Sequence, residues 1–388
     1  MARRHLLRHR DLSRARPPAP PPSSSSMLSI LFDIGGYRDT HISFYHLPLL
    51  PPPGPTTTTT TVFVESDLVF DKAWTKDTGH VNLSHCDGLV TITTTSTDRV
   101  FVCNPATQEF IKLPRGTHNA EVDYYARRRR ILPLVAIGFD QWRNSYVVAR
   151  YFYRRYGGAT TFDDEDDTGE SASSSPEDYD IGHEVFTLGS GDGGSWEVTD
   201  DPPGAIGVEA PICTRRGFYW HSGMPNPRLL RFGLKDRAFE VVARPPTAGE
   251  WSPFDGMAVM DDGKLCYLHT ATEASSLHVW TANDDDGNGD LKWSLLCRID
   301  FPDDELDSDL YALFLPTVIV DGDTLVAVVE EMVYRYNMRH GRMEEVFDIR
   351  RQLQYGRPEY KLRPRDTMVV YSVVPYVETL ISPTTCNY

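Results

Sequence analysis

Four aspartates are the residues of this chain best suited to catalysis: Asp140, Asp255, Asp261 and Asp321. Carboxyl groups that face each other across a substrate can supply the general acid and the general base, or the nucleophile, of a hydrolase. Two of them, Asp140 and Asp321, stand beside predicted turns, where Asp commonly accepts hydrogen bonds from nearby backbone amides. We therefore predict structural roles for these aspartates and no catalytic residue.

Histidines and cysteines could bind a metal ion, but their spacing does not favour it. His85, His183, His221 and His269 form neither an H-E-x-x-H motif nor another short ligand spacing. The six cysteines contain no C-x-x-C pair, and most lie in apolar runs: Cys86, Cys103, Cys213, Cys266, Cys297 and Cys386. A thiol in such a run behaves as a small hydrophobic group, so we predict reduced core cysteines in an intracellular protein. The sequence predicts no metal and no cofactor.

The chain is acidic, which narrows the range of its partners. Its 388 residues carry a formal net charge of −16, whereas a general nucleic-acid binder needs clustered Lys and Arg for phosphate contacts. The same charge disfavours an anionic membrane surface, and no apolar run approaches the roughly 18 residues of a membrane helix. We expect no nucleic acid and no membrane as partners, and a cytoplasmic or nuclear localisation.

Short strands joined by tight turns dominate the chain, as the stretch from 85 to 114 shows. Apolar and polar residues alternate there around Gly88 and around Asn104-Pro105, a period typical of antiparallel hairpins. From Gly217 onward a three-strand unit recurs at a spacing of roughly 45 to 60 residues, close to the period of a kelch repeat. About two dozen strands in groups of four predict an all-β propeller of about six kelch-like blades.

Two further patterns concern how the blades would meet. Strand-like runs at 28–34 and 367–374 are the outermost β segments of the chain, and placing them in one sheet would close the ring and remove its exposed edges. Large aromatic residues recur at matching places in the units, so we predict that they pack between blades. These are Trp196, Trp220, Trp280 and Trp293.

The propeller domain is assigned to residues 27–388, and three segments of the chain are predicted to be a tail or loops without a packed core. Residues 1–26 form a basic tail rich in Pro and Ser; a disordered linker is favoured over a transit peptide because the Pro run breaks any amphipathic helix. Residues 160–180 form an acidic disordered loop, whose contiguous carboxylates lack the alternating spacing of a calcium loop. Residues 127–130, four arginines, are interpreted as a solvated hairpin loop rather than a nuclear import signal.

The order of several motifs resembles a known family. Cys86-x-Gly88-Leu89 is followed by Asn104-Pro105-Ala106-Thr107 and a Leu113-Pro114 exit. Gly138-Phe139-Asp140, Tyr146-Val147-Val148, Ser195-Trp196 and finally Pro375-Tyr376-Val377 follow in the same order as in the plant F-box-associated domain. That domain is the kelch-like, substrate-binding half of many F-box proteins, and the resemblance covers residues from about 80 to about 381.

The resemblance implies a non-catalytic protein-binding module that holds an unknown target protein for an SCF-type ubiquitin ligase. In the family an F-box docks a Skp-type adaptor, but only residues 4–8 resemble the end of an F-box here. We therefore expect the F-box to be missing or truncated, and no binding of the adaptor by this chain alone. The alternative class is a propeller enzyme, a glycoside hydrolase or an oxidase, that uses carboxylates facing the channel.

Overall fold

The computed structural model describes 18 segments of the chain, all of them strands, turns and short connections. They are residues 26–33, 40–48, 67–74, 81–94, 99–120, 135–155, 180–189, 194–207, 211–222, 228–246, 255–260, 263–271, 276–282, 291–300, 315–320, 324–329, 332–348 and 369–384. The predictions for residues 1–25, 127–130 and 160–179, and those for Asp261, Asp321 and Cys386, lie outside the described residues.

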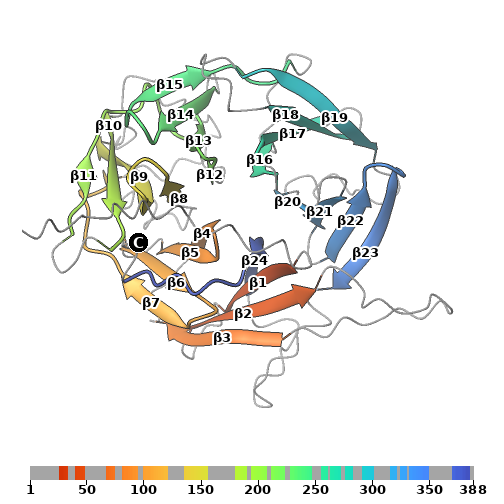
Figure 1. Ribbon diagram of the computed structural model, residues 1–388, viewed down its shortest axis with the longest axis horizontal. Helices are drawn as coiled ribbons and strands as arrows, with labels where there is room; N and C mark the ends of the chain where they lie inside the picture. The colour runs from red at the N-terminus through yellow and green to blue at the C-terminus, as the bar shows by residue number, and fades with distance from the viewer. Residues whose placement is uncertain are drawn as a thin grey trace, which may run out of the picture.

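The 24 strands of the described segments form six four-stranded antiparallel sheets, which stand around a common centre (Figure 1). Sheet 1 contains β24 (Val369–Tyr376), β1 (Ser26–Asp33), β2 (Thr40–Pro48) and β3 (Asp67–Trp74), from the centre outward. Sheet 2 contains β4 (Val81–Cys86), β5 (Leu89–Thr94), β6 (Arg99–Asn104) and β7 (Glu109–Lys112). Sheet 3 contains β8 (Ala136–Asp140), β9 (Ser145–Arg155), β10 (Asp180–Thr187) and β11 (Glu197–Val198).

The other three sheets repeat the order, again from the centre outward. Sheet 4 contains β12 (Ile212–Cys213), β13 (Gly217–His221), β14 (Leu229–Gly233) and β15 (Phe239–Val242). Sheet 5 contains β16 (Gly256–Val259), β17 (Leu265–Ala271), β18 (Ser276–Ala282) and β19 (Trp293–Asp300). Sheet 6 contains β20 (Leu315–Val320), β21 (Thr324–Val329), β22 (Met332–Asn337) and β23 (Arg342–Asp348). The predicted all-β propeller of about six four-stranded blades is confirmed.

The two ends of the chain close the ring in one sheet. β1 pairs antiparallel with β24 along its whole length, from Ser26 opposite Tyr376 to Asp33 opposite Val369. The innermost strands contact one another in the circular order β24, β4, β8, β12, β16, β20 and back to β24. This confirms the predicted shared sheet, and the pairing covers the inner edge of β1.

The hydrophobic core is divided among the contacts between neighbouring sheets. Alternate side chains of a strand point to opposite sides of its sheet, and β13 shows the result. Phe218 and Trp220 pack with residues of sheet 3, whereas Tyr219 packs with residues of sheet 5. All five residues of β13 are buried because both of its faces are covered.

The four tryptophans lie between sheets, as predicted. Trp220 belongs to the core between sheets 3 and 4, Trp196 packs against the core between sheets 2 and 3, and Trp280 and Trp293 pack between sheets 4 and 5. Two of them also fasten the chain where it passes between sheets. The indole of Trp196 donates to the Pro114 carbonyl and that of Trp293 to the Ala243 carbonyl, each at 2.8 Å. Both carbonyls lie within two residues of the end of the outermost strand of the preceding sheet.

Two predicted boundaries are wrong by one residue each. Ser26, assigned to the N-terminal tail, begins β1 and pairs with both Pro48 and Tyr376. Asp180, assigned to the acidic loop, begins β10 opposite Arg155 and forms an ion pair with Arg154 at 2.8 Å. In both cases pairing with a neighbouring strand extends the sheet into polar residues, which local composition does not indicate.

Candidate protein-interaction surface

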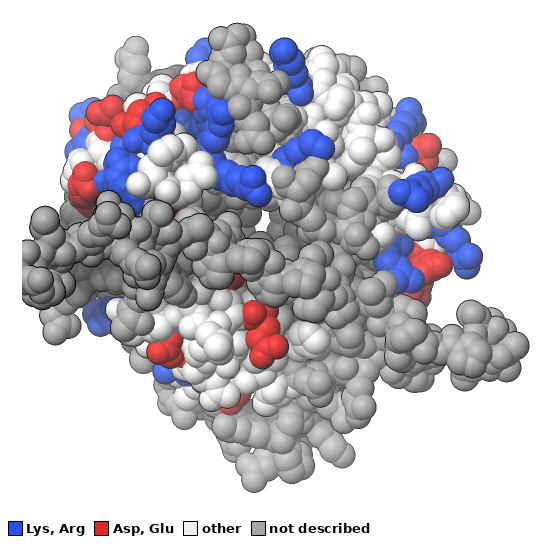
Figure 2. All heavy atoms as spheres, viewed as in Figure 1, with Lys and Arg blue, Asp and Glu red and all other residues white. Residues whose placement is uncertain are grey.

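One face of the ring carries the turns that join the first strand of a sheet to the second, described in full in sheets 2, 3 and 4 and in part in sheet 5. It also carries the described turns that join the third strand to the fourth in sheets 2, 4 and 6. We call it the turn face; it points toward the viewer in Figures 1 and 2. Its turns are tight, as Asp87-Gly88 shows: both residues have positive φ, 49° and 83°, which suits a two-residue hairpin turn. Tyr146 of sheet 3 donates to the Asp87 carboxylate at 3.0 Å, so this turn is also tied to the next sheet.

The C-terminal segment after β24, residues 377–384, crosses the turn face of sheet 2 and is here called the strap (Figure 1). Asn104, fully buried at the end of β6, donates through Nδ2 to the carbonyls of Thr379 and Ile381 at 2.9 and 2.7 Å. Its Oδ1 accepts from the Ala106 amide at 2.9 Å. The Asn-Pro-Ala-Thr motif therefore forms a turn and anchors the strap with one side chain.

Gly88 is required by the same contact. A Cβ at this position would collide with the Val377 carbonyl oxygen and the Thr379 side chain. Ser382 adds a hydrogen bond to Glu109 at 3.1 Å. The strap thus lies directly on the backbone of sheet 2, and its own apolar side chains Val377 and Leu380 remain 51% and 87% exposed.

The turns of sheets 3 and 4 are joined by side chains that reach backbone carbonyls. Asp140 accepts from the amides of Trp142 and Arg143 at 2.9 and 3.0 Å and pairs with the Arg143 guanidinium at 2.9 Å. That guanidinium also donates to the Leu234 carbonyl at 2.6 Å. The structural role predicted for Asp140 is confirmed, because its carboxylate shapes a turn and holds the arginine that bridges two sheets.

Lysine and arginine residues are concentrated on the turns of sheets 3, 4 and 5 on this face. We call them the basic turn cluster: Arg143, Arg215, Arg216, Lys235, Arg237 and Lys264. Gln141 donates to the Arg215 carbonyl at 3.4 Å, and the Leu234 amide donates to the Arg216 carbonyl at 2.8 Å, so the turns are interlocked. In Figure 2, blue side chains gather over the upper left of the face and reach the small central opening. The exposed indole of Trp142, 42% accessible, lies in the first of these turns.

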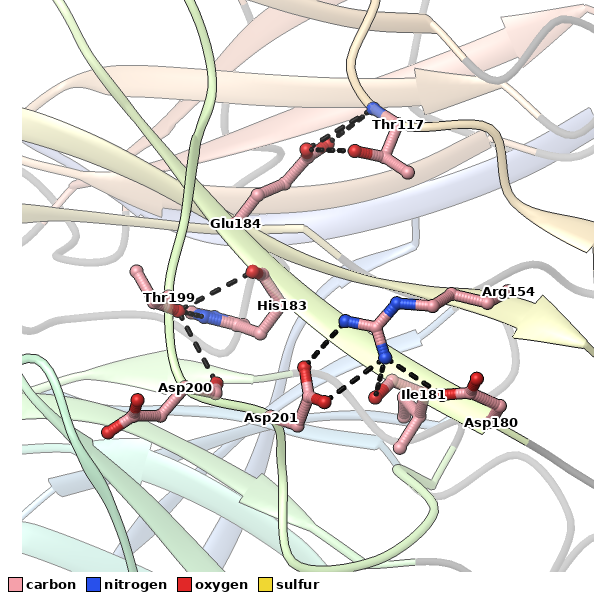
Figure 3. A network of polar contacts seen from close by, with 9 residues as sticks. All are labelled: Thr117, Arg154, Asp180, Ile181, His183, Glu184, Thr199, Asp200 and Asp201. Carbon is pink, nitrogen blue, oxygen red and sulfur yellow. Dashed lines mark hydrogen bonds and ion pairs between the residues drawn. The ribbon is translucent and has the colours of Figure 1, made fainter.

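A buried ion pair between Glu184 of β10 and Arg150 of β9 fixes the passage from sheet 2 to sheet 3. Figure 3 shows the contacts of Glu184 with Thr117 in this passage. Arg150 and Glu184, with side chains 4% and 1% exposed, meet at 2.6 Å. Glu184 also accepts from the Thr117 amide at 3.0 Å and its hydroxyl at 2.8 Å, and Arg150 donates to the Thr117 carbonyl. A charge left unpaired at such a site costs about 3–5 kcal/mol, so the connection is held firmly.

His183, next along β10, points to the opposite side of the strand (Figure 3). Its ring packs on Phe232 and Phe239 with centroids 4.4 and 4.9 Å away, and Nδ1 lies 2.6 Å from the Thr199 hydroxyl. Burial lowers the pKa of His183 to about 3. His183 is therefore a neutral core residue that packs sheet 3 against sheet 4.

Asp255 and the other histidines form a separate group in sheets 4 and 5. Asp255 accepts from the Tyr267 hydroxyl, from His269 Nδ1 and from the Thr270 amide at 2.9, 2.9 and 3.0 Å. The buried ring of His221 lies against Tyr267, with centroids 5.5 Å apart, and burial lowers the pKa of His221 to about 4. Asp255 and Asp140 lie at different sheets, and each carboxylate accepts hydrogen bonds from groups close to it in the sequence.

His85 and the cysteines, the other candidate metal ligands of the sequence, lie in or beside the sheets. His85 lies half-buried in β4 opposite Val90. The five cysteines that the structure describes are not disulfide-bonded, as predicted, and burial raises the pKa of Cys297 to about 11. Within the described segments no three His, Cys, Asp or Glu residues gather as metal ligands, and no helix is long and apolar enough to cross a membrane.

Residues 57–383 match the model of the F-box associated beta propeller domain. The chain belongs to this family. A putative F-box protein of Arabidopsis thaliana is 21% identical over 229 residues, which cover 56% of this chain and 50% of that protein. An F-box/LRR-repeat/kelch-repeat protein of the same plant is 24% identical over 119 residues, covering 30% of this chain and 29% of the relative.

The chain thus spans half the length, or less, of the curated relatives that it matches. Among solved structures, a putative 6-phosphogluconolactonase from Bacteroides uniformis shares 12% identity with a TM-score of 0.40, over 91% of this chain and 100% of that one. At that similarity it gives no information on activity. The family match begins at residue 57, whereas the ring itself extends to Ser26, because β1 and β2 belong to sheet 1.

The Asn104 contacts predict how the strap can be released. Asn104→Asp keeps the oxygen that accepts from Ala106 but cannot donate to the Thr379 and Ile381 carbonyls, whereas Asn104→Ala loses both functions. We expect Asn104→Asp to expose residues 377–384 to limited proteolysis and fast amide exchange, with a loss of about 1–3 kcal/mol in stability. Asn104→Ala should cost more. A strap that stays protected in both variants would show that other contacts hold it.

The buried histidines predict a fall in stability at mild acid pH. An unfolded histidine binds a proton near pH 6.5, whereas folded His183 and His221 do so only near pH 3 and 4, so the unfolded chain binds more protons in between. Stability is then retained above about pH 6.5 and falls by about 2 kcal/mol per histidine by pH 5. Chemical unfolding at pH 7 and pH 5 measures this difference.

Two variants separate protonation from packing at His183. His183→Phe should flatten the pH dependence, since the ring that titrates is gone, although its stability at pH 7 will differ. Thr199→Val removes the hydrogen bond to Nδ1 and should keep the pH dependence. An unchanged slope in His183→Phe would mean that other groups control acid unfolding.

Proposed function

We propose that the turn face binds a target protein and that this chain is the non-catalytic recognition module of an F-box-type ubiquitin ligase. Membership of the F-box-associated propeller family and the F-box proteins among its relatives support the class of function. The cytoplasm and the nucleus are the proposed locations. Binding of a Skp-type adaptor concerns residues outside the described segments, and the expectation that this chain alone does not bind it stays a prediction.

The observation that carries the proposal is the combination of rigidity and exposed apolar area on the turn face. Of the large apolar side chains that the structure describes as exposed, Trp142, Val377 and Leu380 lie on turns or on the strap of this face. The others are Leu68, Val198, Val241, Leu295 and Leu296, all on outermost strands. Tryptophan on a backbone that is already fixed is the kind of residue that dominates protein interfaces, because little conformational entropy is lost on binding.

The propeller enzyme remains the alternative class, and no observation favours it within the described segments. The buried carboxylates described are Asp140, Glu184 and Asp255, and each is hydrogen-bonded to groups that shape turns, strands or connections. Such carboxylates are occupied by structural donors. A hydrolase would instead need two of them to face one substrate.

The test compares two double variants of the whole chain. Trp142→Ala/Leu380→Ala removes exposed apolar groups from the turn face, and the control Val198→Ala/Leu295→Ala removes similarly exposed groups from outermost strands. Each protein is expressed with an affinity tag in plant cells, and captured proteins are quantified by mass spectrometry.

We expect a reproducible set of captured proteins to fall by about tenfold or more with the turn-face variant, and to persist with the control. At least one member of that set should be stabilised when the chain is depleted, as a ubiquitination target would be. Equal capture by the two variants, or loss only in the control, would contradict binding through the turn face.

A further inference from the structure

The basic turn cluster contrasts with the charge of the whole chain. The formal net charge is −16, yet the described parts of four neighbouring turns in sheets 3, 4 and 5 carry six cations. Their described carboxylates are two: Asp140, buried and paired with Arg143, and the exposed Asp236. Asp261 and Asp262 of the fourth turn lie outside the described residues. A local field of positive sign on an acidic protein attracts acidic partners and repels basic ones.

The cations of the cluster differ in the ion pairs and hydrogen bonds that they already form within the protein. Arg143 pairs with Asp140 and donates to two carbonyls of the β14–β15 turn, and Arg237 pairs with Glu197. Arg215 and Lys235 are exposed, and both take part in the contacts between turns through their backbone carbonyls, which accept from Gln141 and Arg143. These two side chains therefore present their charge to solvent from turns that are braced beneath them.

Hydrogen bonds between neighbouring turns, here called the braces, make the cluster a fixed platform that spans three sheets. From the β8–β9 turn, Gln141 donates a hydrogen bond to the Arg215 carbonyl, and Arg143 donates to the carbonyls of Leu234 and Lys235. The Leu234 amide of the β14–β15 turn donates to the Arg216 carbonyl. In sheet 5, Gly263 lies close to Arg215, because a Cβ placed on this glycine would be 3.7 Å from Arg215 Nε. Because the backbone of these turns is already ordered, binding of a ligand loses little conformational entropy, and more of the interaction energy appears as affinity.

Trp142 adds an apolar group to the platform. It lies between Gln141 and Arg143, both engaged in the braces, and its side chain is 42% exposed. An exposed indole on a turn that neighbours arginine-bearing turns suits a peptide that combines carboxylates with an apolar side chain, since Trp and Arg are the residues that most often anchor protein partners. A polyanion such as nucleic acid would instead meet the negative charge of the rest of the chain.

We propose that the basic turn cluster and Trp142 bind an acidic segment of the partner protein, one in which Asp and Glu flank an apolar residue. The inference rests on the proposed function, because it names the chemistry of the segment that the turn face would hold. Carboxylates of the segment pair with Arg215 and Lys235, and its apolar side chain packs on Trp142.

The experiment selects a random peptide library, displayed on phage, on the purified whole chain. The test variant is Arg215→Glu/Lys235→Glu. The control is Arg155→Glu/Arg298→Glu, which changes the net charge equally at exposed cations near the other ends of β9 and β19. A third variant, Trp142→Ala, removes the indole alone. Dissociation constants of a selected peptide are then measured at low and at physiological salt, with single-stranded DNA as competitor.

We expect selected peptides enriched in Asp and Glu around an apolar residue, with affinity lowered about tenfold or more by the test variant and little by the control. The affinity should fall as salt rises, and Trp142→Ala should weaken the same peptide. Peptides without acidic enrichment, no selected peptide, equal loss in the control, or DNA that displaces the peptide at similar concentration would each overturn the inference. Such failure leaves capture of partner proteins by the whole chain unaffected, so it is distinguishable from failure of the proposed function.

Discussion

The pairing of β1 with β24 is the constraint on which the rest of the molecule depends. It joins residues from the two ends of the chain over eight opposed positions, from Ser26–Tyr376 to Asp33–Val369. A ring of sheets that stayed open would expose an unpaired inner strand and the apolar face of a terminal sheet. Closure also sets where the chain leaves β24, and the strap continues from that point onto Gly88 and Asn104. The geometry of the turn face therefore follows from how the ring is closed.

Between neighbouring sheets, apolar packing is supplemented by polar contacts that hold the connecting chain. Glu184 and Arg150 form hydrogen bonds with Thr117. The Trp196 indole donates to the Pro114 carbonyl, and the Trp293 indole donates to the Ala243 carbonyl. A buried backbone group without a hydrogen-bond partner lowers stability. Each of these side chains supplies a partner for a backbone group in a connection between sheets, beyond the end of its strand. The buried ion pair is best understood as a specific positioning device, because its desolvation offsets much of its Coulomb attraction.

Local patterns in the sequence predicted the class of fold and the number of sheets. Alternating runs that begin at Gly217 and Gly263 became β13 to β15 and β17 to β19, and the recurring tryptophans packed between sheets. The innermost strands were harder to predict, since β12 contains only Ile212 and Cys213 and shows no period. Such a short strand is fixed by its neighbours in the ring rather than by its own residues.

The candidate surface could not be predicted from local patterns, because it is made by contacts between distant parts of the chain. Asn104 and Thr379 are 275 positions apart, and Arg143 and Leu234 are 91 apart. The Asn-Pro-Ala-Thr and Pro-Tyr-Val motifs were recognised separately, but only the fold shows that the first anchors the segment that follows the second. Likewise, the arginines and lysines of the basic turn cluster are scattered in sequence and come together only in the ring.

The central claim is that closure by β24 makes the six sheets one cooperative body, with the turn face fixed upon it. Hydrogen–deuterium exchange followed by mass spectrometry, in increasing denaturant, tests it most directly. Amides of β1 and β24 should lose protection together with those of the adjoining inner strands β4 and β20, in one transition. Early exchange of β24 alone, while β4, β8 and β12 stay protected and the strap stays bound to Asn104, would contradict it.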